Sequence, residues 1–213
     1  MYTAPVDASF GEAEWRPFVE DHQFGHLVAS GRDRPVPVVV PTQFVLDGDT
    51  VWLHLVRRNP IFEAVAENPT VLLSIAADWA FIPSAWKAIG DEDPRRGIPT
   101  TYYGAVQLTG SATVLDERTH SGSVAAVLRR QLATIQPAVP VDDPAEVHQP
   151  ALGTILGLRI DLDLDQVKAK FKYGGNVDAA HRAAVVERLR ARAGPGDAAA
   201  AAHVVERLPP GGD

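Results

Sequence analysis

Cysteine is absent from the 213-residue chain. Without thiols the chain cannot form disulfides, thiolate zinc sites, iron–sulfur clusters or a cysteine nucleophile. Long apolar runs are missing too, since no window approaches the roughly 18 uninterrupted apolar residues that a membrane-spanning helix needs. The first residues also lack the basic region followed by an apolar region that marks a secretory signal. We therefore expect a soluble, cytoplasmic protein with no membrane contact.

The glycine-rich motifs of nucleotide-binding enzymes are also missing. Neither GxGxxG nor GxxxxGK occurs, so neither a dinucleotide-binding Rossmann fold nor a P-loop is indicated. Asp161, Asp163 and Asp165 have the spacing of the first three ligands of a calcium loop. That loop needs a glycine at its sixth position and a glutamate at its twelfth, where Gln166 and Lys172 stand instead. We expect no metal site.

Positive charge is scarce. The chain has 20 Lys and Arg against 27 Asp and Glu, which gives a formal net charge of −7. An acidic surface repels phosphodiester backbones unless cations are concentrated locally. The helix expected at Asp178–Ala193 is the one candidate basic element, with Arg182, Arg188, Arg190 and Arg192, but Asp178 and Glu187 dilute its charge. Direct DNA binding is therefore not expected.

What the chain does contain is typical of a globular domain, with 46% hydrophobic and 22% charged residues. Its length suits one domain and a tail, because domains commonly span about 100–200 residues. We expect the domain to occupy residues 1–193. Residues 194–213, which begin with Gly194-Pro195-Gly196 and end in PPGGD, are expected to form a partly helical or disordered C-terminal tail.

Strand patterns dominate the chain and are separated by turn residues. Asp47-Gly48-Asp49 between two of them is a strong hairpin signal. Pro37 and Pro41 cannot donate to a sheet ladder, so their strand is expected to have a free edge or a bulge there. Regularly spaced strands with few long helices predict a mainly β fold, a small barrel with flanking helices. The expected strands are 25–30, 36–46, 50–56, 71–77, 102–115 with a break at Gly110, and a pair within 152–173.

Helical patterns are fewer. An apolar stripe predicts a helix over 7–21, and Asn59 followed by Pro60 suits the start of a short helix over 59–68. Residues 88–99 and 136–150 read as polar or proline-rich loops. The other expected helices are 117–135, 178–193 and 198–208.

Two basic patterns could bind an anion. The first is Arg57-Arg58 before Asn59-Pro60, where a strand leads into a short helix. Adjacent guanidiniums and unpaired helical N–H groups suit a phosphate monoester, although two exposed arginines would give the same pattern. The second is Lys168, Lys170 and Lys172, which alternation places on one face of a strand. Lysines on an edge strand also serve to prevent aggregation, so this pattern is open to both interpretations.

Several segments, in order, resemble the PaiB-type FMN-binding negative transcriptional regulators, which adopt the FMN-binding split-barrel fold. The likeness covers roughly residues 1–189, and its specificity comes from five short motifs in the right order. They are Phe24–Ala29 (FGHLVA), His54–Pro60 (HLVRRNP), Ala80–Trp86 (AFIPSAW), Ile98–Thr100 with Tyr103, and Lys170–Lys172 (KFK) with Asn176.

The resemblance implies a homodimer of split β-barrels with FMN at its interface. Arg57 and Arg58, with the helix beginning at Asn59, would hold the phosphate. The backbone of the proline-containing strand would face the isoalloxazine ring, because such a strand leaves polar groups free. The remaining residues implied are Pro41, Thr42, Gln43 and Phe44 of that strand, Trp86, Thr100 and Tyr103 of the loop region or the partner subunit, and Lys170 and Lys172 as further anion contacts.

The chain departs from the family pattern at three places. The order of serine and proline around Ser84 is changed. The family's Trp–Asn before Tyr103 is here Thr101-Tyr102. A Leu–Ser–Gln stretch after the second lysine is here Tyr173-Gly174-Gly175. All three places are expected to line the flavin or substrate side of the pocket.

Three functions stay open at this point. The resemblance favours a flavin-dependent regulator or sensor. A flavin-dependent oxidoreductase or flavin reductase acting on a small molecule is the alternative, since no DNA-binding motif is visible. A third reading keeps the fold but exchanges FMN for deazaflavin or haem, with His54 as a candidate ligand. In each case the protein orients the cofactor, which supplies the electron chemistry.

Overall fold

The computed structural model describes residues 1–139, 141 and 143–207. The chain forms two compact units, each assembled from segments that are far apart in the sequence. Contiguous sequence patterns therefore give no sign of this division. Unit 1 consists of Met1–Trp15, Ala76–Val106 and Ala169–Asp213, and unit 2 of Arg16–Ile75 and Gln107–Lys168.

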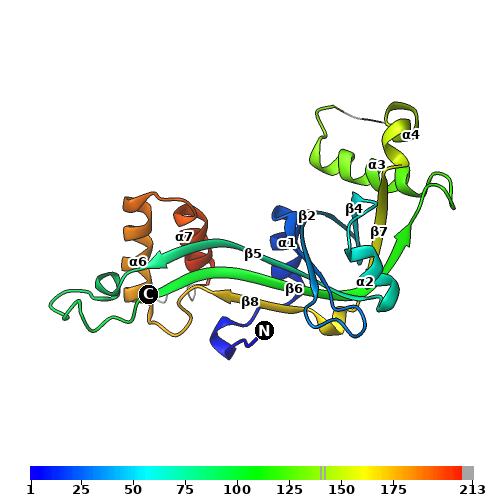
Figure 1. Ribbon diagram of the computed structural model, residues 1–213. Helices are drawn as coiled ribbons and strands as arrows, with labels where there is room; N and C mark the ends of the chain where they lie inside the picture. Colours follow the sequence, from blue (N-terminus) through cyan, green and yellow to red (C-terminus); the bar gives the residue numbers. More distant parts are fainter. Residues whose placement is uncertain (140, 142, 208–213) are drawn as a thin grey trace. The chain divides into compact units, whose positions relative to one another are not determined.

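Unit 2 is built on a mainly antiparallel sheet (Figure 1). Its strands are β1 (Phe24–Ala29), β2 (Val38–Gln43), β3 (Val45–Asp47), β4 (Thr50–Val56), β5 (Thr70–Ile82), β6 (Thr100–Leu115) and β7 (Ile155–Leu162). Their order is β2-β1-β5-β6-β7-β4-β3, so the described strands form an open sheet with β2 and β3 at its edges. This confirms the predicted fold class, although the barrel is not closed.

The proline-containing strand is an edge strand, as Pro41 predicted. It is also divided, because β2 ends at Gln43 and β3 begins at Val45. Phe44 lies at the break, fully buried, and its N–H donates to the carbonyl of Gln23. The expected hairpin follows, with Asp47 paired to Thr50 across a tight turn. Gly48 takes a φ of +58° in this turn, a conformation that favours glycine.

Gly110 lies inside β6 and does not break it. It is paired with Leu162 of β7. A Cβ at this position would lie 2.5 Å from the carbonyl oxygen of Asp161, so glycine allows the two strands to approach closely. The pattern signalled an irregularity here, and the structure shows its cause to be close packing.

Helices flank the sheet of unit 2. α2 (Ile61–Glu67) contacts β1 and β2, and α3 (Ser123–Ile135) contacts β4 and β7. α3 begins six residues later than predicted, since Glu117 lies outside it and its carboxylate accepts from the N–H of Val124. The expected loop 136–150 contains two one-turn helices, α4 (Pro144–Val147) and α5 (Gln149–Leu152).

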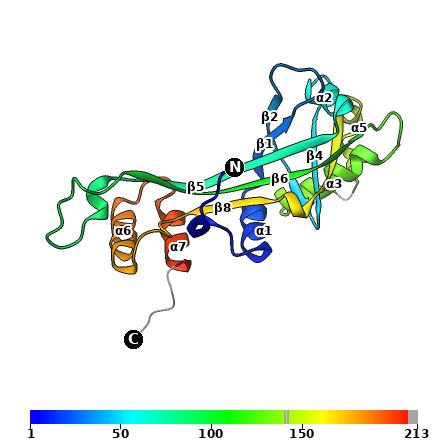
Figure 2. The same cartoon turned by 90° about the horizontal axis from the view of Figure 1, so that it is seen from below.

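Unit 1 contains the second half of β5, the first half of β6 and β8 (Lys168–Lys172), which pairs with β6. α6 (Ala179–Arg192) and α7 (Asp197–Glu206) pack against each other (Figure 2). Asp178 caps α6 by accepting from the N–H of His181. Short 3₁₀ helices lie at η1 (Pro5–Asp7), η2 (Ser84–Lys87) and, in unit 2, η3 (Leu164–Gln166), and α1 (Glu12–Asp21) belongs partly to each unit.

Alternation along β8 follows the predicted pattern. Phe171 is buried at 1% exposure and Tyr173, just beyond the strand, at 0%. Lys168 is exposed, whereas Lys170 and Lys172 are half-buried. The aromatic residues therefore belong to the core of unit 1, and the ammonium groups lie on the other face of the strand.

The described part of the expected C-terminal tail, residues 194–207, includes α7, whose residues Ala200, Ala201 and Val204 are buried in unit 1. Residues 208–213, with the terminal PPGGD, lie outside the described residues. Across the part of the chain that is described, no helix is long and apolar enough to cross a bilayer.

Candidate functional site

The expected site residues are divided between the two units. The members of each group come from different elements of one unit, so their mutual geometry can be described within that unit. Unit 2 contains Pro41, Thr42, Gln43, Phe44, His54, Arg57, Arg58 and Asn59, and unit 1 contains Trp86, Thr100, Tyr103, Lys170 and Lys172.

Arg57 at the end of β4 is already engaged by the protein. Its guanidinium forms a bidentate pair with Asp116, with N–O distances of 2.6 and 2.7 Å. Its Nε also donates to the carbonyl of Gly153 at 3.1 Å. Hydrogen bonding to Arg57 lowers the pKa of the Asp116 carboxyl to about 2, so the pair is ionised at neutral pH. Arg57 therefore joins three segments of unit 2, and its charge is largely neutralised.

Arg58 differs from its neighbour, because its side chain is exposed and has no carboxylate partner among the described residues. It lines a pocket of about 510 Å³ together with Val56, Arg57, Arg118 and Thr154. Arg118 is held beside it by a hydrogen bond of 2.9 Å from its Nη2 to the carbonyl of Gly153, which also lines the pocket. Two guanidiniums thus line a pocket that contains no carboxylate, since the nearby Asp116 is paired with Arg57, and this set suits an anion.

Asn59 performs a local structural role. Its Oδ1 accepts from the N–H of Ile61 at 3.0 Å, next to the start of α2. That amide is thus satisfied within the chain and is not available to a phosphate. Since α2 spans seven residues, the helix contributes less to anion binding than the sequence suggested.

The edge strand β2 presents one open face. Paired residues on adjacent strands share a face, and the pairs His26–Pro41 and Phe24–Gln43 lie on the exposed side. Thr42 and Phe44 point the other way and are buried at 5% and 0% exposure. Of the four expected residues, Pro41 and Gln43 can therefore offer side chains to a ligand on this face.

His54 on β4 is half-buried, and its Nδ1 lies 2.5 Å from Oε1 of Gln131 on α3. Gln131 is itself buried at 5% exposure. The hydrogen bond fixes the ring against α3 and occupies one of its two nitrogens. This is the arrangement of a partnered polar group in a strand–helix interface.

Four of the five expected residues in unit 1 lie together. The ammonium of Lys172 donates to Oγ1 of Thr100 at 2.7 Å. The Lys170 and Lys172 ammoniums lie 5.7 and 6.0 Å from the centre of the Tyr103 ring. Lys170 also lies 3.8 Å from a carboxylate oxygen of Asp7. Strand β8 thus places a pair of cations beside an aromatic ring and a hydroxyl group.

Trp86, the fifth, lies in η2 and is held by arginines of α6. The guanidinium of Arg192 stacks over its ring at 4.5 Å, and Arg188 donates to its carbonyl. Arg188 also donates to the carbonyl of Ala88 at 2.9 Å. Helix α6 therefore fixes the start of the 88–99 loop.

Residues 1–163 match the family described as "Putative FMN-binding domain". The chain belongs to this family. The match includes all the expected residues of unit 2, together with Trp86, Thr100 and Tyr103, and ends before Lys170 and Lys172. The family supports FMN, the cofactor expected from the sequence. Among curated proteins, none matches the sequence significantly.

Solved structures share the fold of this FMN-binding-domain protein at low sequence identity. An FAD- and heme-binding protein from Mycobacterium smegmatis has a TM-score of 0.58 at 17% identity, covering 84% of this chain and 79% of its own. The flavocytochrome Anf3 from Azotobacter vinelandii has a TM-score of 0.55 at 18% identity, covering 78% and 70%. A conserved hypothetical protein from Mycobacterium tuberculosis has a TM-score of 0.56 at 15% identity, covering 81% and 91%.

Two of the departures from the PaiB pattern, at Tyr102 and at Tyr173-Gly174, meet in unit 1. Tyr102 is buried at 2% exposure, and a Cβ at Gly174 would lie 2.4 Å from its hydroxyl oxygen. Gly174 also has a φ of +80°, which disfavours other residues. The Tyr102 ring lies edge-on to that of Tyr173, with centroids 6.2 Å apart. The changed residues therefore pack against each other in this FMN-binding-domain protein.

Sequence reasoning missed Arg118 and Lys87. Arg118 was placed inside the predicted helix 117–135, where it would be one more solvated charge. Its place beside Arg58 depends on pairing between distant strands, which spacing cannot reveal. Lys87 directly follows the AFIPSAW motif, and this position could have indicated it as a site residue.

Proposed function

We propose that this FMN-binding-domain protein holds the FMN phosphate in the pocket of unit 2 and uses the flavin for redox chemistry on a small molecule. The observation that carries the proposal is the pair of guanidiniums, Arg58 and Arg118, in a pocket whose lining residues include no carboxylate. Arginine suits phosphate because its planar donors bind two oxygens at once.

The donor set fits the chemistry of FMN. Arg58 and Arg118 would provide charge-assisted hydrogen bonds to the phosphate. Arg57, paired with Asp116, would act mainly by holding the Gly153 carbonyl that also fixes Arg118. The pocket of about 510 Å³ lies in the range of small-molecule sites. Bound FMN would supply one- or two-electron transfer, and the chain would supply binding and orientation.

A homodimer with FMN at its interface is part of the proposal. The open face of β1 and β2 supports it, because Phe24 and Val39 are exposed there at 61% and 51%. Val39 pairs with Val28 on the same face, beside Pro41 and its partner His26. An apolar face with adjacent polar groups is suited to both a flavin ring and a second subunit.

The α6 arginines favour redox chemistry over DNA regulation, because most of them are bound to other groups of unit 1. Arg182 is buried and donates to the Arg207 carbonyl at 2.7 Å. Arg188 is bound to loop carbonyls, and Arg192 is paired with Asp197 at 2.5 Å. The candidate basic helix thus uses most of its charge inside unit 1. The PaiB-type regulator remains a prediction from the resemblance, and so do deazaflavin and haem as replacement cofactors.

The binding test compares FMN with riboflavin, which lacks the phosphate. Titration of the flavin-free protein, followed by flavin fluorescence, gives both dissociation constants. We expect Arg58→Ala to weaken FMN binding by roughly 10- to 100-fold, the range for charge-assisted hydrogen bonds, and to leave riboflavin binding unchanged. Arg190→Ala, an exposed arginine in unit 1, is the matched control. Equal loss of both flavins, or unchanged FMN affinity in folded Arg58→Ala, would remove the phosphate assignment.

The redox test uses the wild-type protein loaded with FMN. Anaerobic addition of NADH or NADPH should bleach the visible flavin absorbance, and small-molecule acceptors should restore it. A gel shift with duplex DNA at low salt should show no strong, salt-sensitive binding. A flavin that stays oxidised, combined with a steep salt dependence of DNA binding, would favour the regulator instead.

A further inference from the structure

We propose a second anion site, in unit 1, in which Lys87 and Arg96, with the nearby charge of Lys172, bind a small molecule with several phosphate or carboxylate groups. It is separate from the phosphate pocket of unit 2 in its residues and in its unit. No part of the proposal requires bound flavin.

Lys87 and Lys172 form the first part of the site. Lys87 ends η2, while Lys172 ends β8 and donates to the Thr100 hydroxyl oxygen at 2.7 Å. Desolvation lowers the pKa of Lys87, and the nearby charge of Lys172 lowers it further. Neither ammonium has a carboxylate partner among the described residues. Two like charges held close together without a counter-ion would both be stabilised by an anion.

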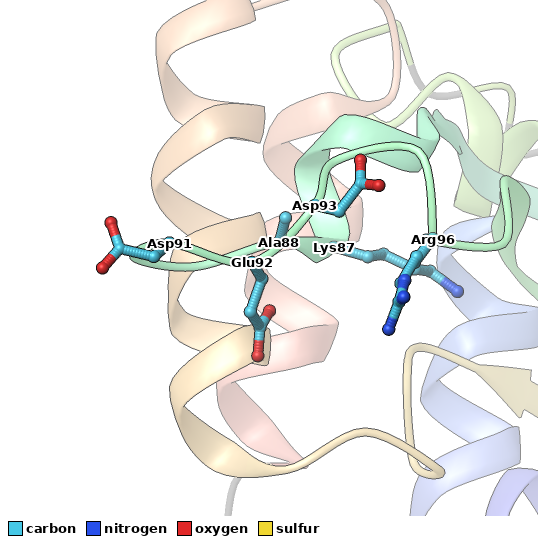
Figure 3. Close-up of a pocket in the computed structure, with 7 residues that line it drawn as sticks. Lys87, Ala88, Asp91, Glu92, Asp93 and Arg96 are labelled. Carbon is cyan, nitrogen blue, oxygen red and sulfur yellow. The ribbon is translucent and has the colours of Figure 1, made fainter.

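Arg96 supplies a third cation from the 88–99 loop. It lines a pocket of about 600 Å³ with Lys87, Ala88 and Gly97. Figure 3 shows Arg96 and Lys87 at the same end of the pocket, at the opposite end from Asp91. Lys172 does not line this pocket and contributes through its charge, which acts on Lys87.

Three acidic residues also line this pocket, and their partners decide its electrostatics. Asp93 is paired with Arg95 at 2.8 Å. Glu92 accepts from the N–H of Ile89 and lies 2.8 Å from Nε2 of His181. Asp91 points away from Lys87 and Arg96 in Figure 3. The carboxylates are therefore directed to other groups, and the cations are left for a ligand.

The backbone of the pocket is held in place before any ligand binds. Arg188 of α6 donates to the carbonyl of Ala88 at 2.9 Å, and His181 holds Glu92 from the same helix. Gly97 lies so close to η2 that a Cβ there would be 2.1 Å from the Ser84 carbonyl oxygen. A rigid frame reduces the entropy that a ligand must overcome, so a small anion could bind without remodelling the loop.

Three separated cations favour a multivalent anion over a single phosphate. Lysine acts as a point charge, and so it accepts phosphate and carboxylate alike. The shared requirement is at least two negative charges on one small molecule. Pyrophosphate and citrate represent the two chemical sources, and comparing them distinguishes a phosphorylated ligand from a polycarboxylate.

The test is isothermal titration calorimetry of the flavin-free protein with pyrophosphate and, separately, citrate, each at ionic strength matched with sodium chloride. We expect at least one of the two to bind. Lys87→Ala and Arg96→Ala should each weaken that binding by roughly tenfold, the effect of about one charge-assisted contact. Lys168→Ala, an exposed lysine on the same strand as Lys172, should leave it unchanged. Circular dichroism establishes that each variant is folded.

Arg58→Ala separates this site from the phosphate pocket. If anion binding is retained in Arg58→Ala and lost in Arg96→Ala, the unit 1 site is supported even if FMN binding by the protein fails its own test. If binding is lost in Arg58→Ala and retained in Arg96→Ala, the anion occupies the unit 2 pocket and the proposal is wrong. No binding of either anion by folded wild-type protein, or equal loss in Lys168→Ala, would also overturn it.

Discussion

The two basic pockets of the molecule are built in opposite ways. In unit 2 the cations are guanidiniums, and the Gly153 carbonyl anchors both Arg57 and Arg118. In unit 1 two of the three cations are ammonium groups on flexible stems, and the fixed part is the backbone around them. The first pocket therefore presents planar guanidinium donors, and the second presents mainly ammonium groups that act as point charges. We expect the first to be selective for phosphate geometry and the second for total charge.

The contrast between Arg57 and Arg58 gives the largest expected effect. Arg57→Ala removes the bidentate pair with Asp116 and the bond to Gly153, so it should lower the free energy of unfolding by about 2 kcal/mol. Arg58→Ala should change it by less than about 0.5 kcal/mol, as is usual for an exposed residue. Urea denaturation of both variants measures the difference. Equal destabilisation would show that the two arginines share one role.

Replacing one cation by the other type sharpens the comparison of the pockets. Arg58→Lys keeps the charge but loses the planar fork, so FMN should bind roughly tenfold more weakly. Lys87→Arg should leave pyrophosphate binding within about threefold of wild type, because the proposed unit 1 site needs a positive charge at this position and no particular donor geometry. Flavin fluorescence and calorimetry provide the two affinities. The opposite ranking would reverse the interpretation of the pockets.

Acid should weaken unit 2 through Asp116. Its pKa is lowered from 3.8 to about 2, so its pairing contributes stability above the unfolded value that is lost as pH falls toward 2. Asp116→Asn should therefore be less stable than wild type at pH 7, and the gap should narrow below about pH 4. The free energies of unfolding of both proteins, measured between pH 7 and pH 3, give this difference in stability. A constant gap would mean that the charge of Asp116 is irrelevant.

The stability of unit 1 should depend on pH in the opposite direction, and less strongly, through His181. Hydrogen bonding to Glu92, and then to Asp178, raises the pKa of His181 above its ordinary value. The stabilisation is therefore complete below about pH 6.5 and is lost as pH rises through the folded-state pKa. His181→Gln should flatten the stability profile near neutral pH. Titration of the His181 ring by NMR supplies the folded pKa, and an unshifted value would contradict the prediction.

Local signals predicted much of this architecture. Pro41 indicated an edge strand because proline cannot donate to a ladder, and alternation over residues 168–173 placed the lysines on one face of a strand and the aromatic residues on the other. The division of the chain into two units had no such signal. It depends on contacts between segments far apart in the sequence.

In the candidate site, too, local sequence signals did not reveal which charged residues pair with distant segments. Spacing placed Arg57 and Arg58 at a strand end but could not tell them apart, since the distinction comes from Asp116, 59 residues away. Likewise, Glu117 fitted a helical pattern, whereas in the structure it accepts from backbone N–H groups at the start of α3. Composition indicates how many charges exist, and tertiary pairing decides which of them are left for a ligand.

The contact between Tyr102 and Gly174 links two distant positions in their tolerance of change. A side chain at 174 would meet the Tyr102 hydroxyl and would also need an unfavourable backbone conformation. Either position is thus constrained by the residue at the other, and a viable replacement at 174 calls for a smaller residue at 102. Relatives that share this contact should carry the tyrosine and the glycine together, so the pair can serve as a marker for a subgroup of the family.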